Sequence, residues 1–149
     1  MAIYEKKGSL LDADVEYYCH QVNCQGRMRS GIAKAIREKW PVVYDSYIQV
    51  ANPVWLGCIQ KVVVDVSQKT VINMFAQEYY GYDGKRYTSY DAFWSCLGAI
   101  RDSVPKGSKI GFPAKIGCGL GGANWKVIRE MIIEVLGEDY EVYIYELEV

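Results

Sequence analysis

A chain of 149 residues and 16.9 kDa fits a single domain, and it is long enough to bury a substantial hydrophobic core. Half of its residues are hydrophobic and 23% are charged, a composition that excludes a disordered chain. The formal net charge of −1 provides no overall positive field for nucleic acid or anionic membrane. No apolar run is long enough for a transmembrane helix, and the N-terminal segment lacks the apolar stretch of a signal peptide. We therefore expect one cytoplasmic, monomeric domain over residues 1–149, with no membrane partner.

The cysteines argue against both a disulfide framework and a metal site. The chain has five of them, an odd number, and none forms a CxxC pair. Cys19, His20 and Cys24 lie close in sequence, but a structural zinc site needs four ligands and His20 is the only histidine. We expect free thiols and no metal or other cofactor.

Strand-like and helix-like segments alternate through the first part of the chain. Residues 3–11 predict a short strand and a turn, and residues 15–22 (VEYYCHQV) predict a buried strand because they are β-branched and aromatic. A helix is expected from Ser30 to Trp40. Pro41 interrupts it and suits the first position of a second helix that continues over residues 42–50.

A hairpin and a loop follow. Residues 58–66 and 70–76 read as two strands joined by a turn. Residues 78–88 are polar, rich in tyrosine and punctuated by glycine, which is typical of a loop. Ser89 suits the N-cap of a helix that runs through Ile100.

The last part predicts a strand, a glycine-rich loop, a helix and a final strand. The first strand spans residues 109–113, and the helix spans about 124–136 and ends at Gly137. Core spacing in the helix is predicted for Val127, Ile128, Met131, Ile132 and Val135. The final strand covers residues 141–149, with Val142, Ile144 and Leu147 near one face. The whole pattern indicates an α/β domain whose mixed sheet carries helices on both faces.

Two segments combine a strand end, a loop of small residues and a helix start. The first is HQVNCQGRMRSGIA (residues 20–33), and the second is IGCGLGGANW (residues 116–125). Ligands of open α/β sheets bind beyond the carboxyl ends of strands, and glycines let backbone N–H groups approach a phosphate at a helix N-terminus. Either loop alone could be a tight connection without a ligand. Two of them, with Arg27 and Arg29 in the first, favour a ligand with two phosphates.

The second loop also matches GxGxxG through Gly117, Gly119 and Gly122. A Rossmann fingerprint opens a larger βαβ array, whereas this loop has only one helix and one strand after it. The chain contains neither GxxxxGK[ST] nor GxSxG.

The segments GSLLDADV, HQVNCQGRMRSGIAKAIREKWP, NMFAQ and GFPAKIGCGLGGANW resemble the macro domain over essentially the whole chain. The branch that they resemble most contains ADP-ribose-1″-phosphate phosphatases and terminal ADP-ribose protein glycohydrolases. The resemblance implies a three-layer α/β/α fold with a mixed sheet of about six strands. It also implies that the ligand is ADP-ribose or ADP-ribose-1″-phosphate, with ADP-ribosylated protein as a further candidate partner.

The resemblance also implies where the ligand lies. The turn at Ser9 and Leu10 would border adenine, although many macro domains carry aspartate where Ser9 stands. Asn23 would face the distal ribose, and the end of the last strand (residues 145–147) would approach the adenine side. The first loop would wrap the diphosphate and distal ribose with Gln25, Gly26, Arg27, Met28, Arg29, Ser30, Gly31, Ile32 and Ala33. The second loop and the fourth strand would contribute Ile116, Gly117, Cys118, Gly119, Leu120, Gly121, Gly122, Asn124, Trp125, Asn73, Phe75 and Gln77.

Catalysis depends on fewer residues. In the phosphatase branch a histidine three residues before the loop asparagine looks catalytic, and His20 has this spacing to Asn23, so His20 and Asn23 are the candidate catalytic residues. The alternative is a strand histidine that only makes hydrogen bonds inside the core. The glycohydrolase branch uses a lysine and an aspartate, but Gly121 stands at the aspartate position. Asp83, Asp91 and Lys85 are candidates in the same region, or else solvated surface charges.

Three functions remain open. The first is hydrolysis of an ADP-ribose derivative, either a 1″-phosphate or an ADP-ribosyl ester on protein. The second is a non-catalytic module that reads or sequesters ADP-ribose. The third is nucleic-acid binding through Arg27, Arg29 and the tyrosine-rich loop, which the net charge disfavours. The same tyrosines could form an aromatic rim, but packing of this loop onto the core is the simpler expectation.

Overall fold

The computed structural model of the chain describes residues 2–147. One six-stranded sheet runs through it in the order β1-β6-β5-β2-β4-β3. The strands are β1 (Ala2–Lys7), β2 (Tyr17–Asn23), β3 (Ile59–Val63), β4 (Thr70–Gln77), β5 (Lys109–Pro113) and β6 (Glu141–Glu146). The β3–β4 pair is antiparallel and the other neighbouring pairs are parallel, so the predicted mixed sheet is confirmed.

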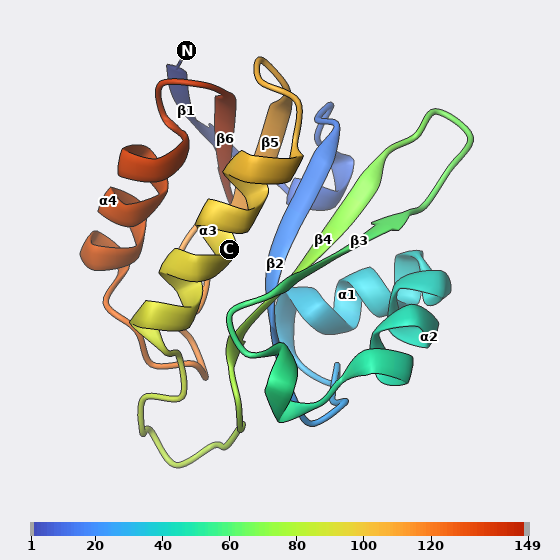
Figure 1. Cartoon of the computed structure of the whole chain (residues 1–149), viewed down its shortest axis with the longest axis vertical. Coiled ribbons are helices and arrows are strands. Elements are labelled where there is room, and N and C mark those ends of the chain that lie inside the picture. Colours follow the sequence, from blue (N-terminus) through green and yellow to red (C-terminus); the bar gives the residue numbers. More distant parts are fainter. Residues whose placement is uncertain (1, 148–149) are drawn as a thin grey trace.

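Four α-helices cover the two faces of this sheet (Figure 1). Helices α1 (Gly31–Lys39) and α2 (Pro41–Val50) lie on one face, and α3 (Tyr90–Ser103) and α4 (Trp125–Leu136) lie on the other. Two short 3₁₀ turns, η1 (Leu10–Asp12) and η2 (Pro53–Trp55), complete the elements. The result is the predicted three-layer α/β/α arrangement. No helix within residues 2–147 is long and apolar enough to cross a membrane.

Local sequence explains most boundaries. Ser89 and Asn124 cap α3 and α4 by accepting hydrogen bonds from Ala92 N and Lys126 N. Pro41 takes the first position of α2, where its missing N–H costs no hydrogen bond. Strand β3 ends at Val63, earlier than predicted, because the Asp65 carboxylate accepts from Ser67 N and Lys69 N and turns the chain.

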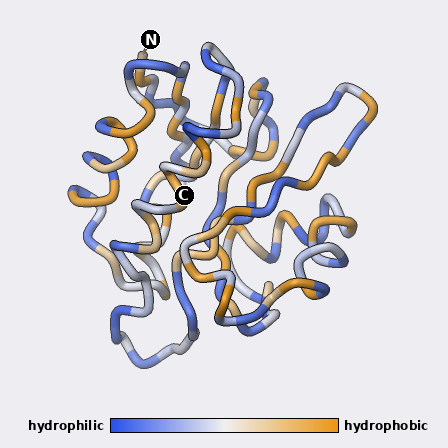
Figure 2. The backbone as a smooth tube through the Cα atoms, viewed as in Figure 1, coloured by the Kyte–Doolittle hydropathy of each residue, from blue (hydrophilic) through white to orange (hydrophobic). Residues whose placement is uncertain are grey.

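The central strands are buried on both faces because helices cover each side. In β2, Tyr18 and Val22 pack toward α1 and α2, whereas Cys19 packs toward α3 and α4. Strand β4 is buried from Thr70 to Ala76. Figure 2 shows hydrophobic colour along much of β4 and mainly hydrophilic colour along the 78–88 loop. The sheet thus separates two hydrophobic clusters, and its connecting loops lie at the ends of its strands.

Two predicted core positions, Val127 and Met131, are not in the core. Val127 is 43% exposed on α4, and Met131 only packs against the cluster edge, whereas Leu136 is fully buried. Leu147 is 65% exposed because β6 ends at Glu146. Residues 148 and 149 of the predicted last strand lie outside the described residues.

Candidate functional site

A cleft lies at the carboxyl ends of the central parallel strands. Its main cavity has a volume of about 1100 Å³ and is bounded by the η1 turn, the start of α1, the 116–121 loop and the end of β6. A smaller compartment of about 350 Å³ adjoins it and shares Gln21, Ser30, Ala33, Gln77 and Leu120 with it. The position agrees with the rule that open α/β sheets bind ligands beyond their strand ends.

The first loop, residues 23–30, is shaped by the Asn23 side chain. Its Oδ1 accepts from Gln25 N at 2.9 Å and from Arg27 N at 3.4 Å, and its Nδ2 donates to Arg27 O at 2.9 Å. The buried Tyr47 hydroxyl of α2 reaches the same loop, accepting from Gly26 N and lying 2.6 Å from Asn23 O. Asn23 lines the smaller compartment, and one of its two Nδ2 hydrogens takes no part in these bonds.

The start of α1 presents backbone donors to the cleft. The first N–H groups of any helix have no acceptor within the helix. Ser30 is the N-cap residue, but its side chain makes no capping hydrogen bond and lies 3.3 Å from the Tyr82 hydroxyl instead. Gly31 has a φ of 56°, a left-handed conformation that favours glycine. Ser30 and Gly31 both line the main cavity, so the positive end of the helix dipole lies at this cavity, where it would favour an anion.

The second loop is held by the segment before α3. The Thr88 hydroxyl donates to Gly117 O at 2.8 Å, and Gly121 O accepts from Tyr87 N and Thr88 N. Gly117 has a φ of 75°, and a Cβ atom on Gly121 would lie 2.5 Å from both Gly117 O and Thr88 Oγ1. Within residues 2–147, the N–H groups of Gly119, Leu120 and Gly121 donate no hydrogen bond, so they remain available to a ligand.

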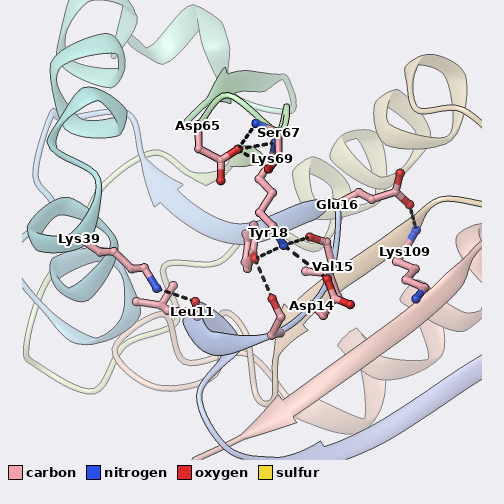
Figure 3. Close-up of polar contacts among 11 residues, drawn as sticks. Leu11, Asp14, Val15, Glu16, Tyr18, Lys39, Asp65, Ser67, Lys69 and Lys109 are labelled. Carbon is pink, nitrogen blue, oxygen red and sulfur yellow. Dashed lines mark hydrogen bonds and ion pairs between the residues drawn. The ribbon is translucent and has the colours of Figure 1, made fainter.

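The turn at Ser9 and Leu10 lines the other end of the main cavity. Ser9 caps η1 by accepting a hydrogen bond from Leu11 N. Two side chains outside the cleft support this turn by hydrogen bonds to its backbone. Lys39 Nζ donates to Leu11 O at 2.8 Å, and the buried Tyr18 hydroxyl donates to Ala13 O at 2.7 Å (Figure 3). The end of β6, at Tyr145, Glu146 and Leu147, lies against the same cavity, as the family resemblance implied.

His20 lies outside the cleft. Its side chain is fully buried on the α1/α2 face of the sheet, and its Nε2 lies 2.5 Å from Asn73 Oδ1. Asn73 in turn donates to Gln60, which donates to Ser46 O of α2. Burial lowers the pKa of His20 to about 4, although the hydrogen bond from His20 Nε2 to Asn73 Oδ1 acts in the opposite direction. This geometry corrects the catalytic assignment of His20 and favours the core alternative.

Other predicted residues also fall away from the two compartments. Asn73 and Phe75 are fully buried under α2, because alternate β4 residues point to that face of the sheet. Met28 is buried beneath the first loop, and Asn124 is occupied as the cap of α4. Gln25, Gly26, Cys118, Gly122 and Trp125 likewise do not line either compartment.

The remaining predicted ligand-binding residues are brought together. They come from the η1 turn, β2, the first loop, α1, β4 and the second loop. These residues line one or both compartments: Ser9, Leu10, Asn23, Arg27, Arg29, Ser30, Gly31, Ile32, Ala33, Gln77, Ile116, Gly117, Gly119, Leu120 and Gly121.

Asp83 and Lys85 form an exposed pair that does not line the cleft. Their charged atoms lie 3.8 Å apart, and Asp83 accepts from Lys85 N and the Tyr87 hydroxyl, which lowers the pKa of its carboxyl group. Asp91 is an exposed residue in the first turn of α3. These positions favour solvated loop charges over catalytic groups.

The tyrosine-rich loop differs from its predicted packing. Tyr79, Tyr80 and Tyr82 are 58%, 42% and 68% exposed, so they do not pack into the core. Tyr80 and Tyr82 instead line the smaller compartment. They contact the first loop through Arg27 Nε, 3.4 Å from the Tyr80 hydroxyl, and through Ser30. The aromatic-rim alternative is thus the one that the geometry supports.

Charge in the cleft is positive near the first loop. Arg27 and Arg29 line the smaller compartment and have no carboxylate within ion-pair distance in the described part of the chain. No three His, Cys, Asp or Glu residues between 2 and 147 come together as a metal site requires, and the five cysteines are unpaired. Burial raises the pKa of Cys24 to about 11, which leaves no reactive thiolate beside the first loop.

Two important residues were missed by sequence reasoning. Gln21 lines both compartments, and Tyr47 shapes the first loop from α2. Gln21 is a polar residue near the end of an otherwise apolar strand, two positions before Asn23, which is the signal that could have identified it. Tyr47 has no such signal, because only the tertiary fold brings α2 against residues 23–26.

No protein-family model matches the chain, and no curated protein is similar enough in sequence to count as a relative. Solved structures do match. The macrodomain of Mycobacterium tuberculosis DarG superposes with a TM-score of 0.82 at 21% identity, over 96% of each chain. A protein of unknown function from Bacteroides thetaiotaomicron superposes with a TM-score of 0.82 at 27% identity, over 98% of each chain.

A third structure was determined with a ligand. Thermosipho africanus DarTG in complex with ADP-ribose matches with a TM-score of 0.77 at 18% identity, over 96% of this chain and 41% of that one. These similarities span nearly the full length of this chain. The chain therefore has the macrodomain fold.

Proposed function

We propose that this protein binds ADP-ribose in the cleft. The observation that carries the proposal is that two sets of backbone N–H groups, at the start of α1 and in the second loop, border one cavity of about 1100 Å³. Such donors suit the oxygens of a diphosphate. The ADP-ribose complex of Thermosipho africanus DarTG supports the same ligand, because that protein shares the fold.

Calorimetry with ADP-ribose tests the proposal. Leu120 is 50% exposed and borders both compartments, so Leu120→Glu places a carboxylate beside the phosphates with little cost to folding. We expect this variant to bind at least about tenfold more weakly, because like charges repel. Val54→Glu, at a site 81% exposed and outside the cleft, is the matched control and should bind normally. No binding by the unaltered protein at millimolar ADP-ribose would overturn the proposal.

We propose hydrolysis of an ADP-ribose derivative as a second candidate function. The smaller compartment favours it, because it leaves room beside the main cavity and carries Arg27 and Arg29, which could stabilise negative charge on a leaving group. With His20 buried and Gly121 without space for a side chain, such a reaction would depend on positioning of substrate and water.

Turnover assays separate this candidate from a non-catalytic reader. The protein is incubated with ADP-ribose-1″-phosphate and, separately, with ester-linked ADP-ribosylated protein. Release of phosphate or free ADP-ribose, reduced in Arg27→Gln, supports hydrolysis. Binding of ADP-ribose without turnover of either substrate supports the reader.

A further inference from the structure

Gln21 occupies the junction between the main cavity and the smaller compartment. It lies on β2, two residues before Asn23, and borders both spaces. Its side chain emerges on the face opposite His20, toward the second glycine-rich loop. It is therefore placed to act on both parts of the cleft.

The Gln21 amide connects three segments. Its Nε2 donates to Gln77 Oε1 at 2.7 Å and to Thr88 Oγ1 at 2.8 Å. The Thr88 hydroxyl in turn donates to Gly117 O, also at 2.8 Å, which links Gln21 to the second loop. Gln77 donates to Tyr79 O, so the start of the tyrosine-rich loop belongs to the same network. One side chain thus ties the floor of the cleft to its second loop and to its rim.

The second loop is fitted closely to this network. A Cβ atom on Gly117 would lie 2.7 Å from Gln21 Oε1 and 3.1 Å from Thr88 Oγ1. A Cβ atom on Gly121 would lie 2.5 Å from Thr88 Oγ1. Because these positions are glycines, the loop backbone can pack directly against the Gln21 and Thr88 side chains. This packing fixes the positions of the N–H groups of Gly119, Leu120 and Gly121.

Packing alone does not account for a glutamine at this position. Gln21 Oε1 is buried and has no hydrogen-bond partner among residues 2–147. A methionine would fill the same space without burying an unpaired acceptor, which is unfavourable. The amide has an unpaired buried oxygen, yet its two donated bonds reach Gln77 and, through Thr88, the second loop.

We propose that Gln21 is a positioning residue that, through Thr88, holds the second loop in the conformation that receives the diphosphate and distal ribose of ADP-ribose. The inference rests on the proposed ADP-ribose binding. It assigns no chemical step to Gln21, which acts through the backbone of the loop.

The test is a double-mutant cycle on ADP-ribose affinity, measured by calorimetry. Gln21→Met and Thr88→Val each remove the Gln21–Thr88 bond while keeping side-chain volume. We expect each to weaken binding about tenfold, which is the effect of losing one or two hydrogen bonds. Because both act through one connection, the double variant should bind about as weakly as either single variant. Thr88→Ser keeps the hydroxyl and should bind within about twofold of the unaltered protein.

Gln60→Met is the control for a merely structural role. Gln60 is also a strand glutamine with two side-chain hydrogen bonds, to Asn73 and Ser46, but it lies on the other face and away from the cleft. It should lower the melting temperature and leave ADP-ribose affinity unchanged. The proposal is overturned if Gln21→Met binds normally, if the two losses multiply to about a hundredfold, or if Thr88→Ser is as weak as Thr88→Val. Absence of binding by the unaltered protein would instead overturn the proposed function, and this inference with it.

Discussion

Two buried polar residues on the α1/α2 face, His20 and Tyr47, show how a side chain's surroundings decide its role. Both are fully buried. His20 has one hydrogen-bonded ring nitrogen, whereas Nδ1 has no partner among the described residues. Tyr47 places its hydroxyl at the first loop. The histidine with suggestive sequence spacing thus belongs to the core, and the tyrosine with none supports the site.

The buried imidazole predicts a loss of stability in acid. The pKa of His20 is about 4 in the folded chain, against 6.5 ordinarily, because burial disfavours the charged form. The unfolded chain therefore binds more protons between these values, so stability falls as pH drops below 6.5 and continues to fall toward 4. From pH 8 to pH 5 the loss should be about 2 kcal/mol, measured by urea unfolding.

His20→Gln isolates this contribution, because glutamine can still donate to Asn73 but does not titrate. The variant should lose about 2 kcal/mol less than the unaltered protein over the same pH interval. If both proteins show the same pH dependence, His20 is not buried in its neutral form.

Tyr47→Phe tests the support of the first loop. The ring contact with Phe75, at 5.7 Å between centroids, is kept, while the bonds to Gly26 N and Asn23 are lost. The free energy of unfolding should fall by about 1–2 kcal/mol, and ADP-ribose affinity should fall several-fold because the loop loosens. Tyr44→Phe is the control, since no side-chain hydrogen bond of Tyr44 is found among residues 2–147. Equal affinities for the two variants would show that Tyr47 does not shape the site.

At the scale of elements, the second loop is a short segment whose glycines are not equivalent. A Cβ atom on Gly121 would strike Gly117 O and Thr88 Oγ1, whereas a Cβ atom on Gly119 would meet nothing within 4 Å. Spacing in the sequence does not distinguish the two positions. The close approach of the backbone at Gly121 to Gly117 O requires a glycine at position 121, whereas position 119 has space for a side chain.

Gly121→Ala should therefore destabilise the protein by about 1–3 kcal/mol, as overpacking does. It should also weaken ADP-ribose binding, because the loop must move to admit the methyl group. Gly119→Ala should change stability by less than about 0.5 kcal/mol. Thermal unfolding and calorimetry of the pair provide the measurement, and similar behaviour of both variants would refute the close fit of Gly121 against Thr88.

At the scale of the whole molecule, one sheet separates two hydrophobic clusters. Trp40 and Trp55 pack on the α1/α2 side, and Trp125 packs on the α3/α4 side. The cleft takes walls from both sides, since α1 belongs to one layer and the second loop precedes α4. Ligand binding therefore depends on the two layers being folded together.

We expect the two layers to unfold as one unit. Tryptophan fluorescence and far-ultraviolet circular dichroism should give coincident urea transitions, because small single domains unfold cooperatively. Saturating ADP-ribose should raise the midpoint of both, since it binds only the folded state. Separate transitions, with the fluorescence midpoint of Trp125→Phe shifted from that of Trp40→Phe, would contradict this prediction; each variant keeps three of the four tryptophans.

Much of the architecture follows from local features of the sequence. Alternating patterns located the strands and helices, because core periodicity, an N-cap such as Ser89 and a first helical residue such as Pro41 are local properties. The turn predicted at Ser67, Gln68 and Lys69 joins two strands, and these pair antiparallel as β3 and β4. Glycine-rich strand-to-helix loops predicted a cleft for a phosphate ligand, and both loops do border one cavity.

Tertiary structure alone decided which residues reach that cavity. Residues 20 and 21 are adjacent on β2, yet alternation places His20 beneath α2 and Gln21 in the cleft. Sequence spacing does not reveal which face of a doubly covered strand meets the ligand, because both faces are buried. Tyr47 and Thr88 act on the loops from elsewhere in the chain, so only the packed fold shows that the two glycine-rich loops depend on them.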